Sequence, residues 1–424
     1  MVHLNHLFSS IVRWVKNGIL FYWLSFFILI VIEFFIGGIF SKVLARENYS
    51  FYVNVLNTLP FYSILVNLGI SYSISYVIAH NPAIRFSFLK QSFSMQRKWY
   101  LLLAAIHLGI CIIFSHAYFD ILFVTTVISY TYAYKLNLTA YFVATGAWSR
   151  AVLSNTLQKT SIAVAIAIIY FSHSLQVFVN GHFIPVYILL ELGVVLFYFI
   201  LFPGINRQIA SSLKASYRKR IYSFGKYAML NNGLNVLYYT LITLIIRTSE
   251  LDTHLQIITG LSLLFFRYSA VSIAPVFASM SPQLTKIKGS TELVQQLYKK
   301  YLAFSVSFAL LIVLGCMLCF SFVIHRFYAA SYHDLPKYFS FYVYLIPLLF
   351  INSFHGTFLS AIGKIKTTTL AEIICTVILL CFMAWNFLSP VSNYKFINYM
   401  VCIHLVVKFI ILSAGILKNI RKQP

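Results

Sequence analysis

Six ionisable side chains lie inside long apolar stretches of this sequence, where charges are rare. They are Glu33, Lys135, Glu191, Arg267, Glu372 and Lys408. A charge near the centre of a bilayer costs at least about 2.5–3.5 kcal/mol on insertion scales, so such residues normally face a bundle interior or an aqueous cavity. Arg267 stands out because apolar residues precede it and a guanidinium keeps its charge even when buried. It therefore requires a partner, water or an anionic ligand, and we favour a role in a cavity.

The other charges leave two interpretations open. Three of them could line a cavity or form structural ion pairs, namely Lys135, Glu191 and Lys408. Glu372 lies about one helical turn inside its apolar stretch and close in sequence to Lys364 and Lys366. That position favours an ion pair at the membrane interface over a functional role.

Glu33 is an isolated carboxylate in the outer half of the first apolar stretch. Desolvation disfavours the charged form of such a group. Glu33 could therefore carry a proton or bind a cation, and it is the candidate residue for a coupling ion, H⁺ or Na⁺. A structural partner on another helix is the alternative.

Polar residues recur at four-residue spacing in two of the apolar stretches. The first stripe contains Asn67, Ser71 and Ser75, and the second contains Asn231, Asn235, Tyr239 and Thr243. This spacing places each stripe on one face of a helix. Such residues can simply join helices, but stripes at the start of each half, together with Arg267, favour a shared hydrophilic cleft.

The sequence lacks the residue patterns of the common catalytic and cofactor sites. His107, His355 and His404 are isolated from one another, and no glycine-rich phosphate loop or nucleophile motif is present. Cys316 and Cys319 form a CxxC pair without a second pair or a histidine cluster, which is typical of small residues packed in a helix. We expect neither an enzyme nor a resident cofactor.

The composition explains which elements must position these residues. Of 424 residues, 60% are hydrophobic and only 10% are charged, whereas soluble domains carry about 25% charged residues. The net charge of +23 does not indicate nucleic acid, because the basic residues form short clusters between apolar runs. Helices of about 20 residues cross a bilayer, and twelve candidates are found at 19–40, 51–79, 99–119, 121–146, 161–178, 183–203, 226–247, 255–280, 300–324, 339–362, 368–388 and 396–417.

The charge distribution fixes a topology for these spans. With the N-terminus in the cytoplasm, most Lys and Arg residues fall in cytoplasmic segments, as the positive-inside rule requires. Both termini are then cytoplasmic. A long connection at about 204–224 divides the chain into two halves of six spans, at 1–210 and 211–424. Equal halves are typical of transporters built from a duplicated bundle, so we expect an all-α integral membrane protein.

Several short stretches resemble a known family. They are residues 44–52 (LARENYSFY), 67–69 (NLG), 274–275 (AP), 281–284 (SPQL), 327–332 (FYAASY) and 361–364 (AIGK). In order and spacing they resemble Wzx-type O-antigen flippases, within the multidrug/oligosaccharidyl-lipid/polysaccharide (MOP) superfamily that includes the MATE exporters. Ser50 departs from the pattern, because the family commonly has glycine there.

The resemblance implies two six-helix bundles around a central cationic cleft. It implies transport of a polyprenyl-pyrophosphate-linked oligosaccharide across the bacterial inner membrane by alternating access. Arg267 matches a cationic position of the cleft, with Arg46, Lys135 and Arg247 as weaker anchors for the diphosphate, and Asn67, Asn231 and Asn235 would contact glycan. Expected partners are the lipid-linked oligosaccharide, membrane lipid, and polymerase and chain-length components of the same pathway, but not nucleic acid.

Two other functions compete with this one. A MATE-like drug/cation antiporter needs acidic residues in its cleft, and only Glu33, Glu191 and Glu372 are available within the spans. A membrane enzyme such as an O-antigen polymerase usually carries a large periplasmic loop, whereas the longest external loop expected here is about 325–337. An acyltransferase would need a histidine beside a polar partner, and the sequence places none there.

Overall fold

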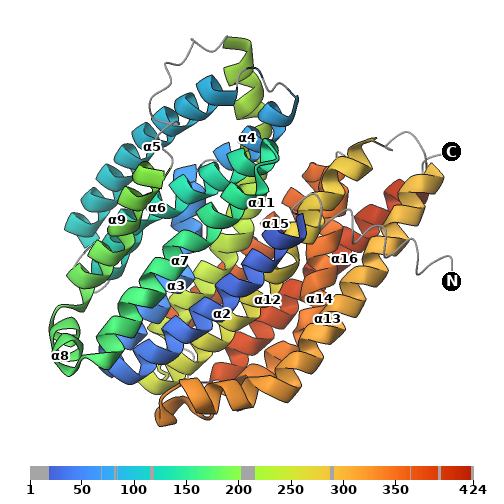
Figure 1. The fold of residues 1–424 in the computed structure, drawn as a ribbon. Helices are drawn as coiled ribbons and strands as arrows, with labels where there is room; N and C mark the ends of the chain where they lie inside the picture. The colour runs from blue at the N-terminus through green and yellow to red at the C-terminus, as the bar shows by residue number, and fades with distance from the viewer. Residues whose placement is uncertain are drawn as a thin grey trace, which may run out of the picture. The chain divides into compact units, whose positions relative to one another are not determined.

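The structure is a computed structural model that describes residues 19–67, 69–80, 83, 85–114, 119–201, 215–286, 291–362, 364–389 and 393–421. Within these ranges every regular element is a helix (Figure 1). The chain divides into two compact units, Met1–Asn48 with Leu59–Met229, and Tyr49–Thr58 with Leu230–Pro424. The boundary expected at 210/211 lies outside the described residues. One helix, α3 (Arg46–Asn67), contributes to both units, and it contains Pro60 close to the division.

The N-terminal unit is a bundle of α2 (Ile19–Val43), the second half of α3, α4 (Ile70–His80), α5 (Arg85–Phe114), α6 (Phe119–Ala144), α7 (Trp148–Phe171), α8 (His173–Gly181) and α9 (Phe183–Leu201). In this unit α2 packs against α7, while α6 packs against α4, α5, α7 and α9. Gly69, between α3 and α4, and Gly146, between α6 and α7, have φ values of 69° and 71°. Glycine adopts this left-handed conformation without steric cost, so both breaks follow from the sequence.

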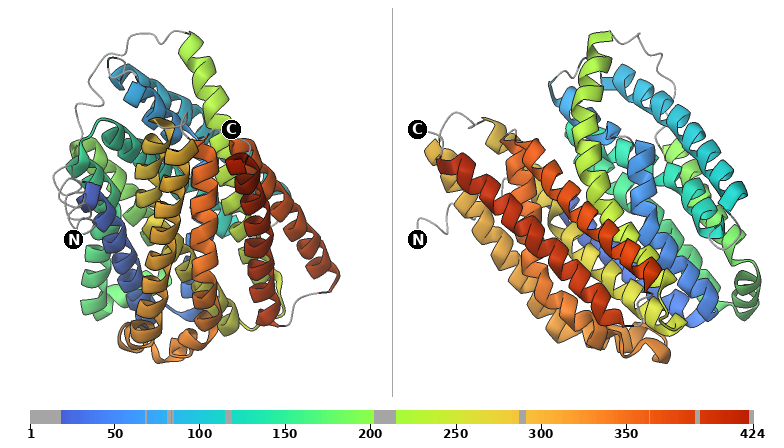
Figure 2. Two further views of the ribbon diagram at one scale, coloured as in Figure 1. Left: turned by 90° about the vertical axis from the view of Figure 1, so that its right-hand side faces the viewer. Right: turned by 180° about the vertical axis from the view of Figure 1, so that it is seen from behind.

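The C-terminal unit contains α11 (Ala215–Thr248), α12 (Thr253–Lys286), α13 (Thr291–Phe327), the 3₁₀ turn η3 (Ala330–Tyr332), α14 (Leu335–Ala361), α15 (Ile365–Leu388) and α16 (Tyr394–Arg421). Residues of α11 before Leu230 belong to the other unit. The central helix is α14, which packs against α12, α13, α15 and α16 (Figure 2).

The prediction of an all-α integral membrane protein is confirmed. Seven described stretches are long and apolar enough to cross a membrane on their own: Leu24–Val43, Trp148–Phe171, Thr253–Ile273, Glu292–Phe327, Ala330–Ala361, Ile365–Asn386 and Tyr394–Lys418. A bent pair, α8 with α9, passes the same test together. Eleven of the twelve expected spans coincide with a helix or, at 51–79, with the pair α3 and α4.

One expected span was placed wrongly. The fifth was expected at 161–178, but α7 begins at Trp148 and ends at Phe171, and a separate helix follows. The polar residues around position 158 led to that error, because they suggested a connection between spans. These residues instead belong to α7, and their side chains are buried in the bundle, where Gln158 and Lys159 contact other polar groups.

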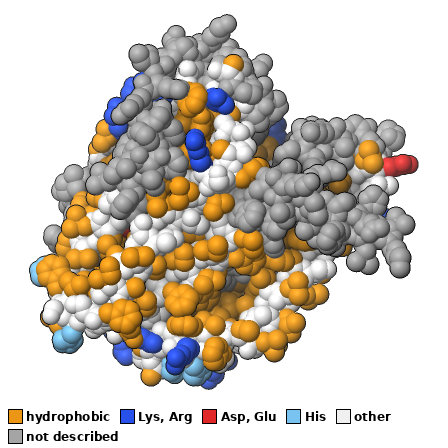
Figure 3. Space-filling view, viewed as in Figure 1, with side chains coloured by type: hydrophobic (Ala, Val, Ile, Leu, Met, Phe, Trp, Pro, Cys, Tyr) orange, Lys and Arg blue, Asp and Glu red, His pale blue; other side chains and the backbone are white. Residues whose placement is uncertain are grey.

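Apolar side chains cover much of the surface shown in Figure 3, and lysine, arginine and histidine side chains gather toward its ends. On α13 the exposed residues include Leu311, Leu314, Leu318 and Phe322. A soluble protein rarely exposes so large an apolar area. Contact with lipid accounts for this surface.

Candidate functional site

Arg267 lies near the middle of α12 and is held by two contacts within the C-terminal unit. Its Nη1 atom donates a hydrogen bond to the backbone oxygen of Asn57 at 3.1 Å, and its guanidinium carbon lies 5.3 Å from the centroid of the Tyr239 ring. Among the described residues, no carboxylate forms an ion pair with Arg267. A guanidinium has five N–H donors. The site therefore holds a positive charge with donor capacity that these contacts leave unused.

The local structure of α3 explains how Asn57 reaches Arg267. Pro60 lies inside α3, one turn after Leu56, and it leaves the backbone oxygen of Leu56 without its helical N–H donor. The Asn57 side chain is fully buried and donates from Nδ2 to the backbone oxygen of Gly260 at 3.2 Å. A Cβ atom at Gly260 would lie 3.1 Å from Cγ1 of Val53. The absence of a side chain at Gly260 thus permits the close approach of α3 to α12.

The polar stripe of α11 contacts charged groups along its length. Tyr239 lies against the Arg267 guanidinium, and the Oδ1 atom of Asn235 accepts a hydrogen bond from the ammonium of Lys408 at 3.3 Å. Asn231 Oδ1 is buried and has no hydrogen-bond partner among the described residues. The stripe therefore lies in a polar interior of the C-terminal unit.

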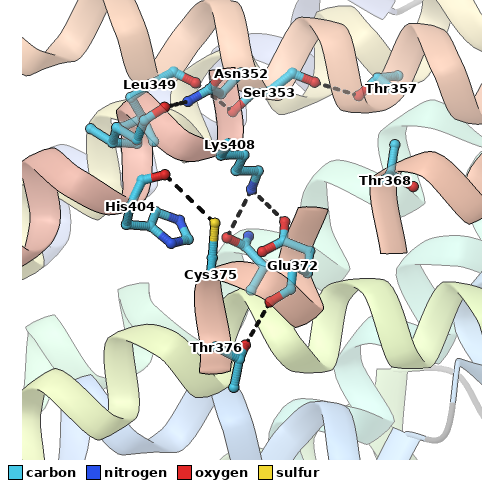
Figure 4. A network of polar contacts seen from close by, with 12 residues as sticks. Leu349, Asn352, Ser353, Thr357, Thr368, Glu372, Cys375, Thr376, His404 and Lys408 are labelled. Carbon is cyan, nitrogen blue, oxygen red and sulfur yellow. Dashed lines mark hydrogen bonds and ion pairs between the residues drawn. The ribbon is translucent and has the colours of Figure 1, made fainter. Parts of the chain in front are cut away.

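Glu372 on α15 and Lys408 on α16 form an ion pair, and both side chains are largely buried. Figure 4 shows Lys408 pointing toward Glu372, with Cys375 and His404 alongside. The Cys375 thiol donates to the backbone oxygen of His404 at 3.7 Å. Glu372 thus pairs with Lys408 and not with Lys364 or Lys366, the partners that its sequence position suggested, because the packing of α15 against α16 brings Lys408 beside it.

A second set of buried charges lies in the N-terminal unit. The Nζ atom of Lys159 on α7 is 2.6 Å from Oε1 of Glu33 on α2. Lys159 and Lys135 on α6 both lie over the Tyr132 ring, with Nζ atoms 5.3 and 4.9 Å from its centroid. Sequence reasoning missed Lys159, because it fell just before the expected fifth span. The signal was present: residues 148–171 contain neither glycine nor proline, so one helix could include it.

Glu191 on α9 completes this set of charges. Its carboxylate accepts hydrogen bonds from Gln158 Nε2 at 2.5 Å and from the Tyr187 hydroxyl at 3.2 Å. Lys135 is 8% exposed, and within the part of the chain that the structure describes it lies within 4 Å of no carboxylate. Glu33, Glu191, Lys135 and Lys159 carry two negative and two positive formal charges, so the cluster is balanced.

Asn67 is used in packing between helices. It is 2% exposed, its Nδ2 donates to Oδ1 of Asn137 at 2.9 Å, and its Oδ1 accepts from the Ser71 backbone and hydroxyl. Asn137 in turn donates to Gln96 at 2.5 Å. The described contacts thus engage both polar atoms of the Asn67 amide.

Arg46 and Arg247 lie at helix ends. Arg46 is exposed at the start of α3, and Arg247 is in the last turn of α11. Arg267 lies 14 residues along α12, or about 20 Å from its start at 1.5 Å per residue. Arg247 lies close to the turn between α11 and α12, so the structure does not place it next to Arg267.

His355 looked isolated in the sequence, but in the structure it has polar neighbours from other helices. Its ring nitrogens lie 3.1 Å from the Tyr298 hydroxyl and 3.5 Å from Oγ of Ser413. The imidazole is 3% exposed, and this burial favours a packing role over catalysis. Among the described residues no group of His, Cys, Asp or Glu could hold a metal ion.

Comparison with known proteins identifies the fold. No family model matches the chain, and no curated protein sequence matches it. An inward-facing MATE transporter of the MOP superfamily superposes with a TM-score of 0.71 at 14% identity, covering 93% of this chain and 96% of that one. An outward-facing MATE transporter of the same superfamily gives a TM-score of 0.65 at 13% identity, covering 96% of each chain.

A third solved structure is a MOP superfamily transporter from Pyrococcus furiosus, described as having a binding pocket of reverse polarity that suggests a different function. It gives a TM-score of 0.61 at 13% identity, covering 96% of each chain. At these identities the likeness concerns the fold alone. This chain thus has the fold of the MATE transporters of the MOP superfamily.

Proposed function

We propose that this protein is a flippase that moves a polyprenyl-pyrophosphate-linked oligosaccharide across the bacterial inner membrane by alternating access. Arg267 anchors the diphosphate. The observation that carries this proposal is a buried positive charge without a carboxylate partner. The Arg267 guanidinium is held by a backbone oxygen and an aromatic ring, and among the described residues no carboxylate pairs with it.

The chemistry of the site matches a diphosphate. A guanidinium forms paired, charge-assisted hydrogen bonds to phosphate oxygens, and these bonds are about twice as strong as neutral ones. The contacts to Asn57 and Tyr239 fix the guanidinium in place before an anion arrives. Such preorganisation lowers the entropic cost of binding.

The balance of buried charges favours an anionic over a cationic substrate. Glu33 pairs with Lys159 and Glu372 with Lys408, while Glu191 accepts hydrogen bonds from Gln158 and Tyr187. A drug/cation antiporter would need a carboxylate free to receive its substrate. The three carboxylates within the spans already have partners, whereas Arg267 has no acidic partner in the part of the chain that the structure describes.

The fold supports transport by alternating access. Solved structures with this fold include MATE transporters in inward-facing and outward-facing conformations. The reverse polarity described for the Pyrococcus furiosus protein illustrates that one fold can carry binding pockets of different charge.

The remaining residues have supporting roles in this proposal. Asn231 and Asn235 contact the glycan, and Lys135, Arg46 and Arg247 assist the diphosphate along its path. Glu33 couples transport to H⁺ or Na⁺ through its pairing with Lys159. The polymerase and chain-length components that use the transported unit are the expected functional partners.

Complementation tests the proposal. In a strain that lacks the chromosomal copy, Arg267→Ala should abolish surface polysaccharide while the protein remains in the membrane at near-normal abundance. Arg267→Lys should restore part of the activity, because lysine keeps the charge but lacks the planar fork of donors. Arg150→Ala, at an exposed arginine near the start of α7, is the matched control. Loss of Arg267→Ala from the membrane would instead indicate a structural role.

A further inference from the structure

The short helix α8 runs across the direction of the helix that follows it. α8 (His173–Gly181) connects α7 to α9, and the axes of α8 and α9 differ by 103°. A helix nearly perpendicular to a membrane-spanning helix runs roughly parallel to the bilayer surface. Figure 1 shows α8 at the lower left, at the end of the N-terminal bundle where it connects α7 and α9.

The residues of α8 form an apolar and a polar stripe. Leu175, Phe178 and Val179 recur at the spacing of one helix face. Val179 is buried against the protein, but Leu175 and Phe178 are 38% and 53% exposed. On the other side His173, Gln176 and Asn180 form the polar stripe, next to Val177, which is 61% exposed.

The helix before α8 carries an exposed apolar stripe toward its C-terminal end. Val164, Ile168 and Phe171 share one side of α7 at helical spacing and are 56%, 58% and 85% exposed. On a spanning helix such residues contact lipid. α8 begins two residues after Phe171, so the chain enters α8 at the end of this lipid-facing stripe.

The polar stripe of α8 forms hydrogen bonds to the junction between α2 and α3, which belongs to the same unit. Asn180 Oδ1 accepts from the backbone N–H of Ala45 at 2.7 Å, and its Nδ2 donates to the backbone oxygen of Val43 at 2.6 Å. The Asn48 side chain donates to the backbone oxygen of Asn180 at 2.9 Å. A single residue of α8 thus binds both sides of the junction between α2 and α3.

We propose that α8 is an interfacial helix that lies in the headgroup region of the bilayer. Leu175 and Phe178 insert into the boundary with the acyl chains, as the apolar face of an amphipathic interfacial helix does. Through Asn180, α8 fixes the α2–α3 junction, residues 43–48, to the membrane surface. The partner is the lipid surface itself, whatever substrate the protein moves.

Spin labelling tests this placement in reconstituted vesicles. A nitroxide would be attached at residue 175, 178 or 173, in a variant whose six native cysteines are replaced by alanine and which retains the melting temperature of the natural protein. Labels at 175 and 178 should be several-fold more accessible to oxygen than to a water-soluble nickel chelate, and the label at 173 should show the reverse. Equal access of the nickel chelate to 178 and 173 would overturn the proposal.

A second measurement tests the link to the α2–α3 junction. A nitroxide at the exposed residue 47 should become more mobile when Asn180→Ala is introduced, because the variant removes two of the three hydrogen bonds that connect Asn180 and this junction. His173→Ala, on the same helix but outside the junction, should leave that mobility unchanged. An unaltered spectrum in Asn180→Ala would show that α8 does not fix the junction.

Discussion

The ammonium nitrogen of Lys159 lies 2.6 Å from a carboxylate oxygen of Glu33, and the side chains are 6% and 10% exposed. These residues come from α7 and α2, which pack against each other over much of their length. A buried pair of this kind is costly to break, since removing one partner leaves the other charge uncompensated in a medium of low dielectric constant.

The Glu33–Lys159 pair should stabilise the folded protein only when both partners are present. Glu33→Gln and Lys159→Met should each lower the free energy of unfolding, by up to about 3–5 kcal/mol for a fully buried pair. The double variant should lose less than the sum of the two, by at least about 1 kcal/mol. Thermal unfolding in detergent measures this, and additive losses would show that the two residues do not interact.

Glu33 should also couple transport to an ion gradient. Glu33→Gln keeps the shape of the side chain but cannot change charge. We expect this variant to bind lipid-linked substrate normally yet to lose its response to a proton or sodium gradient in reconstituted vesicles. Glu33→Gln combined with Lys159→Met removes the unpaired ammonium and serves as the control. Undiminished gradient-dependent transport in Glu33→Gln would exclude Glu33 from coupling.

A variant of Asn67 can distinguish a role in helix packing from a role in glycan contact. Asn67→Leu should lower the melting temperature, because the partner atoms of Asn137 and Ser71 lose their hydrogen bonds inside the unit, at about 1–3 kcal/mol for each buried group left unsatisfied. If glycan contact were the main role of Asn67, this variant would lose transport with unchanged stability.

Gly260 should be sensitive to side-chain size. A Cβ atom there would come within 3.1 Å of Val53 and 3.7 Å of Asn57, so Gly260→Leu should push α3 away from α12 and weaken the contact between Asn57 and Arg267. Transport and thermal stability should both fall. Gly315→Leu is the control, because nothing lies within 4 Å of a Cβ at Gly315. Equal tolerance of leucine at both positions would contradict the close packing.

Much of the fold follows from hydropathy, because lipid requires long apolar helices whose backbone groups are satisfied internally. The error at the fifth span has the same origin. Gln158 and Lys159 lower the local hydropathy, but Nε2 of Gln158 and Nζ of Lys159 bind carboxylates inside the bundle. A hydropathy profile counts the free-energy cost of burying a polar side chain. It does not include the hydrogen bond or ion pair with a residue far away in the sequence that offsets this cost.

The sequence identified Arg267 as a buried charge but not the groups that hold it. Asn57 carries no periodic signal, and it lies on α3, more than 200 positions before Arg267. Likewise Glu372 and Lys408 meet only because α15 and α16 pack together. Partners on different helices depend on tertiary packing, which the sequence of either helix does not specify.

The most direct test of the central proposal is the binding of a polyprenyl diphosphate to purified protein in lipid nanodiscs. Two to three charge-assisted hydrogen bonds removed without replacement cost at least about 1.5–3 kcal/mol, so the Kd of Arg267→Gln should rise ten- to hundredfold. Arg267→Lys should fall between this variant and the natural protein, and Arg150→Gln should bind normally. An unchanged Kd in Arg267→Gln would contradict the assignment of Arg267 as the diphosphate anchor.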